Sequence, residues 1–140
     1  MNTISTNLKT VLNLAKVQTI LNRRFDSGLG GVGFNEFIIL YHLSQSPDGK
    51  IRRVDLAEKV GLTASGVTRL LLPMEKTGLI KRGETERDAR VSYVLIAPGG
   101  QQRLAEATER AEELVEELFP SEVKLSELTK LLFSLGASIK

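Results

Sequence analysis

Four polar residues lie at the start and along one face of a helix predicted over residues 64–77. They are Thr63, Ser65, Thr68 and Arg69, and the opposite face carries Val67, Leu70 and Leu71. An arginine guanidinium can bind guanine through two hydrogen bonds, which is worth about 1–3 kcal/mol of discrimination. The short hydroxyl side chains let the helix approach closely and can reach a base or a phosphate. This pattern favours contact with double-stranded DNA over the alternative of a solvated helix face.

A second group of charged residues lies between two predicted strands, residues 79–83 and 90–96. Arg90 suits the narrow minor groove, where the negative potential is strongest. Asp88 would repel phosphate, so its predicted role is to hold Arg90 or Arg87 by a charge-assisted hydrogen bond. The alternative is a charged hairpin turn in water. The remaining cations either contact phosphate or only keep the protein soluble: Arg52, Arg53, Lys81, Arg82 and Arg87.

A short helix is predicted just before these groups, over residues 53–60. Ala57 is small enough for the next helix to cross closely, and Gly61 permits the positive φ of a tight turn. Val67 then points back into the angle between the two helices. Together with the two strands, this spacing predicts a winged helix-turn-helix.

Positive charge is concentrated in the segment that would face phosphate. The whole chain has a net charge of only +2. Residues 50–90 carry ten basic and six acidic side chains, net +4, whereas residues 91–140 carry five basic and eight acidic ones, net −3. Chance alone can produce such an asymmetry, but beside the helix-turn-helix spacing it favours electrostatic binding to DNA.

Composition excludes several other functions. The chain has no cysteine, which rules out disulfides, thiolate metal sites and cysteine redox sensing. No nucleophile and base form a catalytic motif, so we expect neither an enzyme nor a metal or cofactor. Residues 28–33 have the letters of a dinucleotide fingerprint, but a helix precedes them, so a tight interhelical connection is the better interpretation. With no membrane-length apolar run and no signal peptide, we expect a cytoplasmic protein.

Helices are predicted on both sides of the winged segment. Residues 4–25 and 35–45 form the first two, with Asn35 as the N-cap of the second. Pro98 begins a third that ends at Phe119, and Ser121 or Ser126 caps a last one, which carries an apolar stripe through Ile139. The stripes on the first and last helices can bury each other, but a second subunit covers them more easily. We therefore expect a mainly α, two-fold homodimer with a β-hairpin wing, in which residues 1–33 and 98–140 dimerise and residues 34–97 bind DNA.

With these pieces in order, the chain resembles the MarR (multiple antibiotic resistance regulator) family over nearly its whole length. The matching residues are 54–61, Ser65, 67–69, 74–80, Arg82 and the Asp88-Ala-Arg90 motif. The resemblance implies a dimeric transcription regulator on a pseudo-palindromic DNA site, often a repressor that a small aromatic anion releases. It also implies that an effector binds near the first two helices, at Arg24, Phe37, Tyr41 and His42. For these four, hydrophobic packing and surface positions are the alternative.

Two positions depart from the family pattern. Ala97 stands where a threonine usually caps the following helix, so Pro98 must set that helix start. Pro73 falls inside the predicted recognition helix, where a proline costs about 3 kcal/mol in an ideal helix. Because it follows the residues expected to touch DNA, we expect it to bend or end the helix without abolishing binding. A winged-helix protein-interaction module with weak DNA binding is the alternative function, and specific, salt-sensitive duplex binding separates the two.

Overall fold

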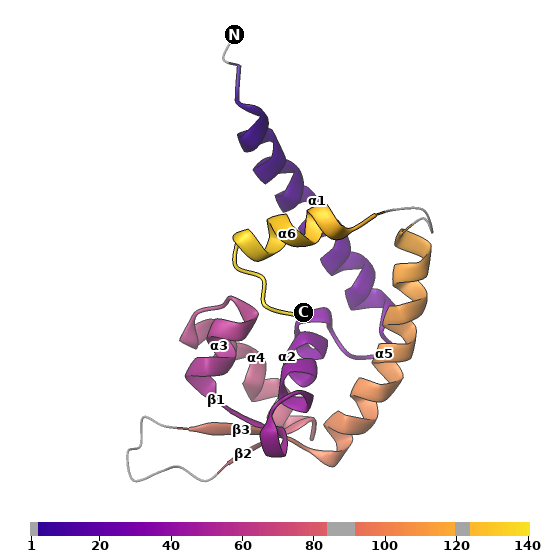
Figure 1. Cartoon of the computed structure of the whole chain (residues 1–140). Coiled ribbons are helices and arrows are strands. Elements are labelled where there is room, and N and C mark those ends of the chain that lie inside the picture. Colours follow the sequence, from indigo (N-terminus) through magenta and orange to yellow (C-terminus); the bar gives the residue numbers. More distant parts are fainter. Residues whose placement is uncertain (1–2, 84–91, 120–123) are drawn as a thin grey trace.

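The computed structural model describes residues 3–83, 92–119 and 124–140. This part of the chain is mainly helical, with a small three-stranded sheet at the end opposite the N-terminus (Figure 1). The elements are α1 (Thr6–Gly28), α2 (Phe34–Ser44), β1 (Lys50–Arg52), α3 (Arg53–Val60), α4 (Ala64–Lys76), β2 (Ile80–Arg82), β3 (Tyr93–Ile96), α5 (Pro98–Leu118) and α6 (Ser126–Ser134). The fold class predicted from the sequence, a winged helix-turn-helix with flanking helices, is confirmed.

The sheet is antiparallel, with the strand order β1-β3-β2. Ile51 of β1 pairs with Val94 of β3, and Ile80 of β2 pairs with Ile96. Ile51, Ile80 and Val94 are buried, so each strand turns an apolar side chain to the core. Residues 50–52 thus form an edge strand that pairs with β3, the second strand of the hairpin.

One hydrophobic core joins the sheet to α2, α3 and α4. Its fully buried members include Leu40 and Leu43 of α2, Leu56 of α3, and Val67 and Met74 of α4. Burying a side chain of this size is worth about 1.5–3 kcal/mol. The buried face of α4 is therefore fixed against the core, which leaves its opposite face outward.

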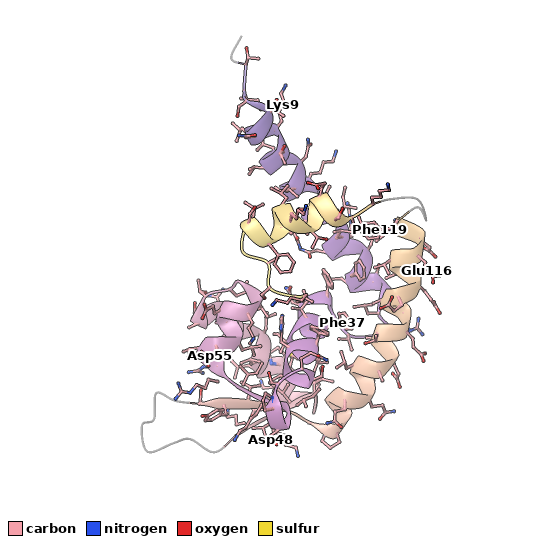
Figure 2. The ribbon with its side chains drawn as sticks, viewed as in Figure 1. Lys9, Phe37, Asp48, Asp55, Glu116 and Phe119 are labelled. Atoms are coloured by element: carbon pink, nitrogen blue, oxygen red, sulfur yellow. The ribbon has the colours of Figure 1, made fainter. Side chains whose placement is uncertain are left out.

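A second core joins the C-terminal half of α1 to α5. Ala107 and Ala111 of α5 are buried beside Phe25 of α1 and Leu29, which follows α1. The Phe25 ring stacks on Phe34 with 4.7 Å between centroids. Phe37 lies between α2 and α5 and packs against both cores, so it connects the winged segment to the long helices (Figure 2).

The predicted start of α2 needs correction. Gly33, not Asn35, is the N-cap of α2. The amide of Gly33 donates to Oε1 of Glu36 at 2.9 Å, and the amide of Phe34 donates to Oδ1 of Asp26 at 2.7 Å. These two carboxylates satisfy amides at the start of the helix, so no cap from Asn35 is needed.

Both ends of α6 also differ from expectation, whereas α4 ends within one residue of its predicted end. Pro73 does not end α4, which continues to Lys76. Ser126 is the first helical residue of α6 and does not cap it, because Leu125 is the N-cap and makes no side-chain hydrogen bond there. Ser121 lies outside the described residues. Ile139 lies beyond the last helical residue, so the apolar stripe is longer than the helix. The start of α5 is as predicted, with Pro98 in its first turn and no side-chain cap from Ala97.

The apolar stripes of α1 and α6 remain exposed. The N-terminal half of α1, which carries Lys9, projects beyond the rest of the described chain (Figure 2). Exposed apolar side chains on or beside these helices are Ile4, Leu8, Val11, Leu12, Val17, Leu125, Leu128, Leu131, Leu132, Phe133, Leu135 and Ile139. Within one chain, therefore, the two stripes do not bury each other. None of the described helices combines the length and apolar character needed to cross a membrane.

Candidate nucleic-acid interface

The turn between α3 and α4 has the geometry that its sequence predicts. Gly61 adopts φ +73°, and a Cβ built on it would meet nothing within 4 Å. The backbone conformation, not lack of space, therefore favours glycine here. The amide of Leu62 donates to the carbonyl of Ala57 at 3.0 Å and closes the turn. This turn sets the angle at which α4 leaves α3.

The hydroxyl groups at the start of α4 have partners inside the helix. Thr63 is the N-cap, and its Oγ1 accepts from the amide of Gly66 at 3.1 Å and lies 3.2 Å from Oγ of Ser65. Thr68 donates its hydroxyl proton to the carbonyl of Ala64 at 3.0 Å. Thr63 therefore serves first to begin the helix. The oxygens of Ser65 and Thr68 keep acceptor capacity, and the Thr68 methyl group can meet a ligand.

Arg69 stands on the exposed face of α4, one helical turn after Ser65. The buried residues Val67, Leu71 and Met74 occupy the other side of the same helix. Among the described residues, Arg69 has no ion pair or hydrogen-bond partner for its side chain. Its guanidinium is therefore available to an outside acceptor.

The strands of the hairpin place Arg82 beside the end of α4. Nε of Arg82 lies 3.1 Å from Oε2 of Glu75, and both side chains are exposed. Arg82 is one of the residues predicted to contact DNA, and its pairing with Glu75 was not predicted from the sequence. Three other predicted DNA-binding residues, Arg87, Asp88 and Arg90, lie outside the described residues.

The four residues implied for effector binding do not form a single set of contacts. Nη2 of Arg24 lies 3.4 Å from Oε2 of Glu117, which ties α1 to α5. Phe37 packs between the two cores. The Tyr41 and His42 rings meet edge to face at 5.5 Å between centroids. The structure thus pairs Arg24 with a carboxylate and places Phe37 in the core, and the effector role of all four stays a prediction.

His42 is buried on α2, with 8% of its surface exposed. Burial, and to a smaller extent the positive charge of Lys59, lower the pKa of His42 below its ordinary value. The ring is therefore neutral near pH 7. Within the described ranges, no group of three or more His, Cys, Asp or Glu side chains is arranged to hold a metal ion.

The glycine-rich residues 28–33 connect α1 to α2, as predicted. Two apolar residues in this connection enter the cores, which was not predicted from the sequence. Leu29 is 1% exposed and Val32 is 3% exposed. The glycines on either side of them indicate a loop, so the sequence pattern of these six residues does not show that Leu29 and Val32 are buried.

Comparison with known proteins gives a consistent result. The MarR family model matches residues 30–91. Over 107 residues, the chain is 24% identical to YdgJ, an uncharacterised helix-turn-helix-type transcriptional regulator of Bacillus subtilis strain 168. That match covers 75% of this chain and 62% of YdgJ, so the chain spans less than two thirds of that relative.

Solved structures share the fold over almost the whole chain. The transcriptional regulator BldR from Sulfolobus solfataricus is 28% identical, with a TM-score of 0.83 over 96% of this chain and 97% of BldR. Sco3205, a MarR family transcriptional regulator from Streptomyces coelicolor solved in complex with DNA, is 19% identical. Its TM-score is 0.79 over 96% of this chain and 87% of Sco3205.

The α3–α4 turn, the outward face of α4 and the antiparallel sheet define a winged helix-turn-helix protein. Residues 30–91, which contain this turn, α4 and β2, match the model of the MarR family, and the whole described fold is similar to that of solved transcriptional regulators.

Proposed function

We propose that the chain binds a pseudo-palindromic site in double-stranded DNA as a homodimer and represses transcription there. The main support for this proposal is the orientation of α4. Its buried face is fixed in the core, while Arg69 faces outward without a partner in the described chain. In proteins of this architecture, the N-terminal residues of the recognition helix enter the major groove. Sco3205, which has a similar fold, was solved in complex with DNA, and this supports DNA binding by the chain.

The proposed dimer uses the helices at both ends of the chain. Leu8 and Val11 of α1 are 43% and 55% exposed, and Leu131 of α6 is 40% exposed. Apolar stripes of this length are typical of surfaces that another subunit covers. We assign dimerisation to residues 1–33 and 98–140 and DNA binding to residues 34–97. A second copy of the chain then places two copies of α4 on successive major grooves.

The first test is the symmetry of the bound site. Duplexes selected from a random pool should contain two inverted half-sites about 10 base pairs apart, centre to centre, because a two-fold dimer presents two copies of α4. Sedimentation at micromolar concentration should give about twice the chain mass of 15.4 kDa. A monomer in sedimentation, or selected sites with a single asymmetric element, would contradict the dimer. Duplex binding that lacks both sequence preference and salt dependence would favour a protein-interaction module.

The wing carries a second prediction, derived from the sequence because Asp88 and Arg90 lie outside the described residues. We propose that Asp88 orients Arg90 for the minor groove. Arg90→Ala and Asp88→Ala should then both weaken operator binding, and the double variant should bind no worse than Arg90→Ala alone. If charge repulsion alone mattered, Asp88→Ala would instead strengthen operator binding, because it removes an anion near phosphate. Titration of the three variants against the operator at one salt concentration decides the question. If the two substitutions lower the affinity independently, Asp88 does not act through Arg90.

We also propose that a small aromatic anion releases the protein from DNA and that the protein acts in the cytoplasm. Both rest on the family. For the effector, we keep Arg24, Phe37, Tyr41 and His42 as candidates, although Arg24 would first have to leave Glu117.

A further inference from the structure

Two cavities lie near the three-stranded sheet, and their charges differ. The larger, about 680 Å³, has Asp48, Asp55 and Glu58 in its lining together with the cations Lys50, Arg52 and Lys59. Figure 2 labels Asp48 and Asp55 on this side of the protein. Its carboxylates balance its cations, so it offers no net attraction to an anion.

The smaller cavity, about 220 Å³, lies between α4 and strands β2 and β3. We call it the α4–sheet cleft, and the polar residues that line it include Arg53, Thr68, Glu75, Lys81, Arg82 and Ser92. Its lining has three cations and one carboxylate. The net positive charge and the hydroxyl groups suit a singly charged oxyanion.

Backbone contacts hold the cationic wall of this cleft in place. The amide of Arg53 donates to the carbonyl of Ser92 at 2.9 Å, which fixes the start of α3 beside β3. Thr68 lines the cleft from α4, next to Arg69 in the chain. The cleft is thus continuous with the outward face of α4, where the proposed DNA site lies. We therefore expect a duplex seated on α4 to bring its backbone over this opening.

We propose that the α4–sheet cleft seats one phosphodiester of the DNA backbone, and that Glu75 holds Arg82 until the phosphate replaces it. This inference rests on the proposed DNA binding. It separates cations that the sequence could not rank, because Arg53, Lys81 and Arg82 line the cleft while Arg52 lines the other cavity. Glu75 becomes a positioning residue that opposes phosphate binding.

The exposure of the ion pair makes the exchange feasible. The side chain of Arg82 is 74% exposed and that of Glu75 is 40% exposed, so the pair is weak in water. A phosphodiester carries the same single negative charge as the carboxylate and can take its place. Since every DNA sequence has the same backbone, Glu75 should lower affinity for all duplexes by a similar factor. Glu75 thereby limits binding to random DNA without reading a base.

The test compares Glu75→Gln with Glu109→Gln on operator and random duplexes. Glu109 is an exposed residue of α5, so its substitution makes the same change in net charge away from the cleft. Glu75→Gln should raise affinity for both duplexes by the same factor, roughly two- to fivefold. Arg82→Ala should weaken both and reduce the salt dependence by about one phosphate contact per subunit. In the Arg82→Ala background, Glu75→Gln should cause no further change in duplex affinity.

Several outcomes would overturn the assignment. If Glu75→Gln has the same affinity for DNA as Glu109→Gln, the proposed exchange is wrong. It is also wrong if the gain in affinity persists in the Arg82→Ala background. Titrations in chloride and in inorganic phosphate at equal ionic strength should agree. A loss of duplex affinity that occurs only in inorganic phosphate, and that Arg82→Ala does not show, would identify a free anion as the occupant of the cleft. If the wild type binds no duplex in a salt-dependent way, the proposed function itself fails, which is a distinct result. Thermal unfolding of each variant confirms that it is folded.

Discussion

Replacing Arg69 with alanine is expected to reduce operator affinity by about 1–3 kcal/mol, roughly 5- to 150-fold, and to reduce affinity for random duplex much less. The reason is geometric. Arg69 projects from the face of α4 opposite Val67 and Met74, and it has no competing partner in the described chain. A guanidinium in the major groove can donate two hydrogen bonds to one guanine, and alanine offers neither.

Two comparisons separate base contact from charge. Arg69→Lys keeps the positive charge but loses the planar pair of donors, so it should retain random-duplex affinity and lose most of the operator preference. Arg82→Ala should weaken both duplexes by a similar factor, because a phosphate contact carries no sequence information. Measured at one salt concentration, equal losses on both duplexes for Arg69→Ala would make Arg69 a phosphate contact instead.

The helix-turn-helix was predictable because its signals are local. Gly61 follows the short helix at the position that needs φ +73°, and Ala57 is buried in the core that α3 shares with α4. The boundaries of α3 match the sequence prediction, and those of α4 differ by one residue. Thr63 shows the limit of reading polar residues as DNA contacts, since a threonine just before a helix is first a cap.

The contacts that sequence reasoning missed join residues that only the tertiary fold brings together. Asp26 of α1 binds the amide of Phe34, which removes the need for a cap from Asn35. Glu75 reaches Arg82 only because β2 turns back along the end of α4. Neither pairing has a fixed sequence spacing that would reveal it.

Pro73 shows how tertiary packing overrides a local preference. A proline lacks the amide proton for one helical hydrogen bond, yet α4 continues three residues beyond it. Leu71 and Met74 on either side of Pro73 are both buried in the core, and their burial offsets a cost of about 3 kcal/mol. The helix therefore reaches within one residue of its predicted end at residue 77 despite the proline.

The start of α5 carries the other large expected effect, a loss of stability in Gly100→Ala. Gly100 is the third residue of α5 and is buried. A Cβ there would collide with the carbonyl oxygen of Leu79, and it would lie 3.0 Å from Cγ1 of Ile96 and 3.1 Å from Cδ2 of Leu40. The Leu79 carbonyl cannot move freely, because it accepts a hydrogen bond from the amide of Ala97 at 3.0 Å.

Overpacking of this kind typically costs about 1–3 kcal/mol, and we expect the upper end because the obstacle is backbone. Urea unfolding at a fixed protein concentration measures the loss, since the stability of the proposed dimer would depend on concentration. Gly28→Ala is the matched control. Its Cβ would meet the tip of the Leu114 side chain at 2.7 Å, which can turn away, and alanine favours the helix by up to about 1 kcal/mol. If Gly100→Ala unfolds at the same urea concentration as Gly28→Ala, the close approach of α5 to the Leu79 carbonyl does not limit the residue at position 100.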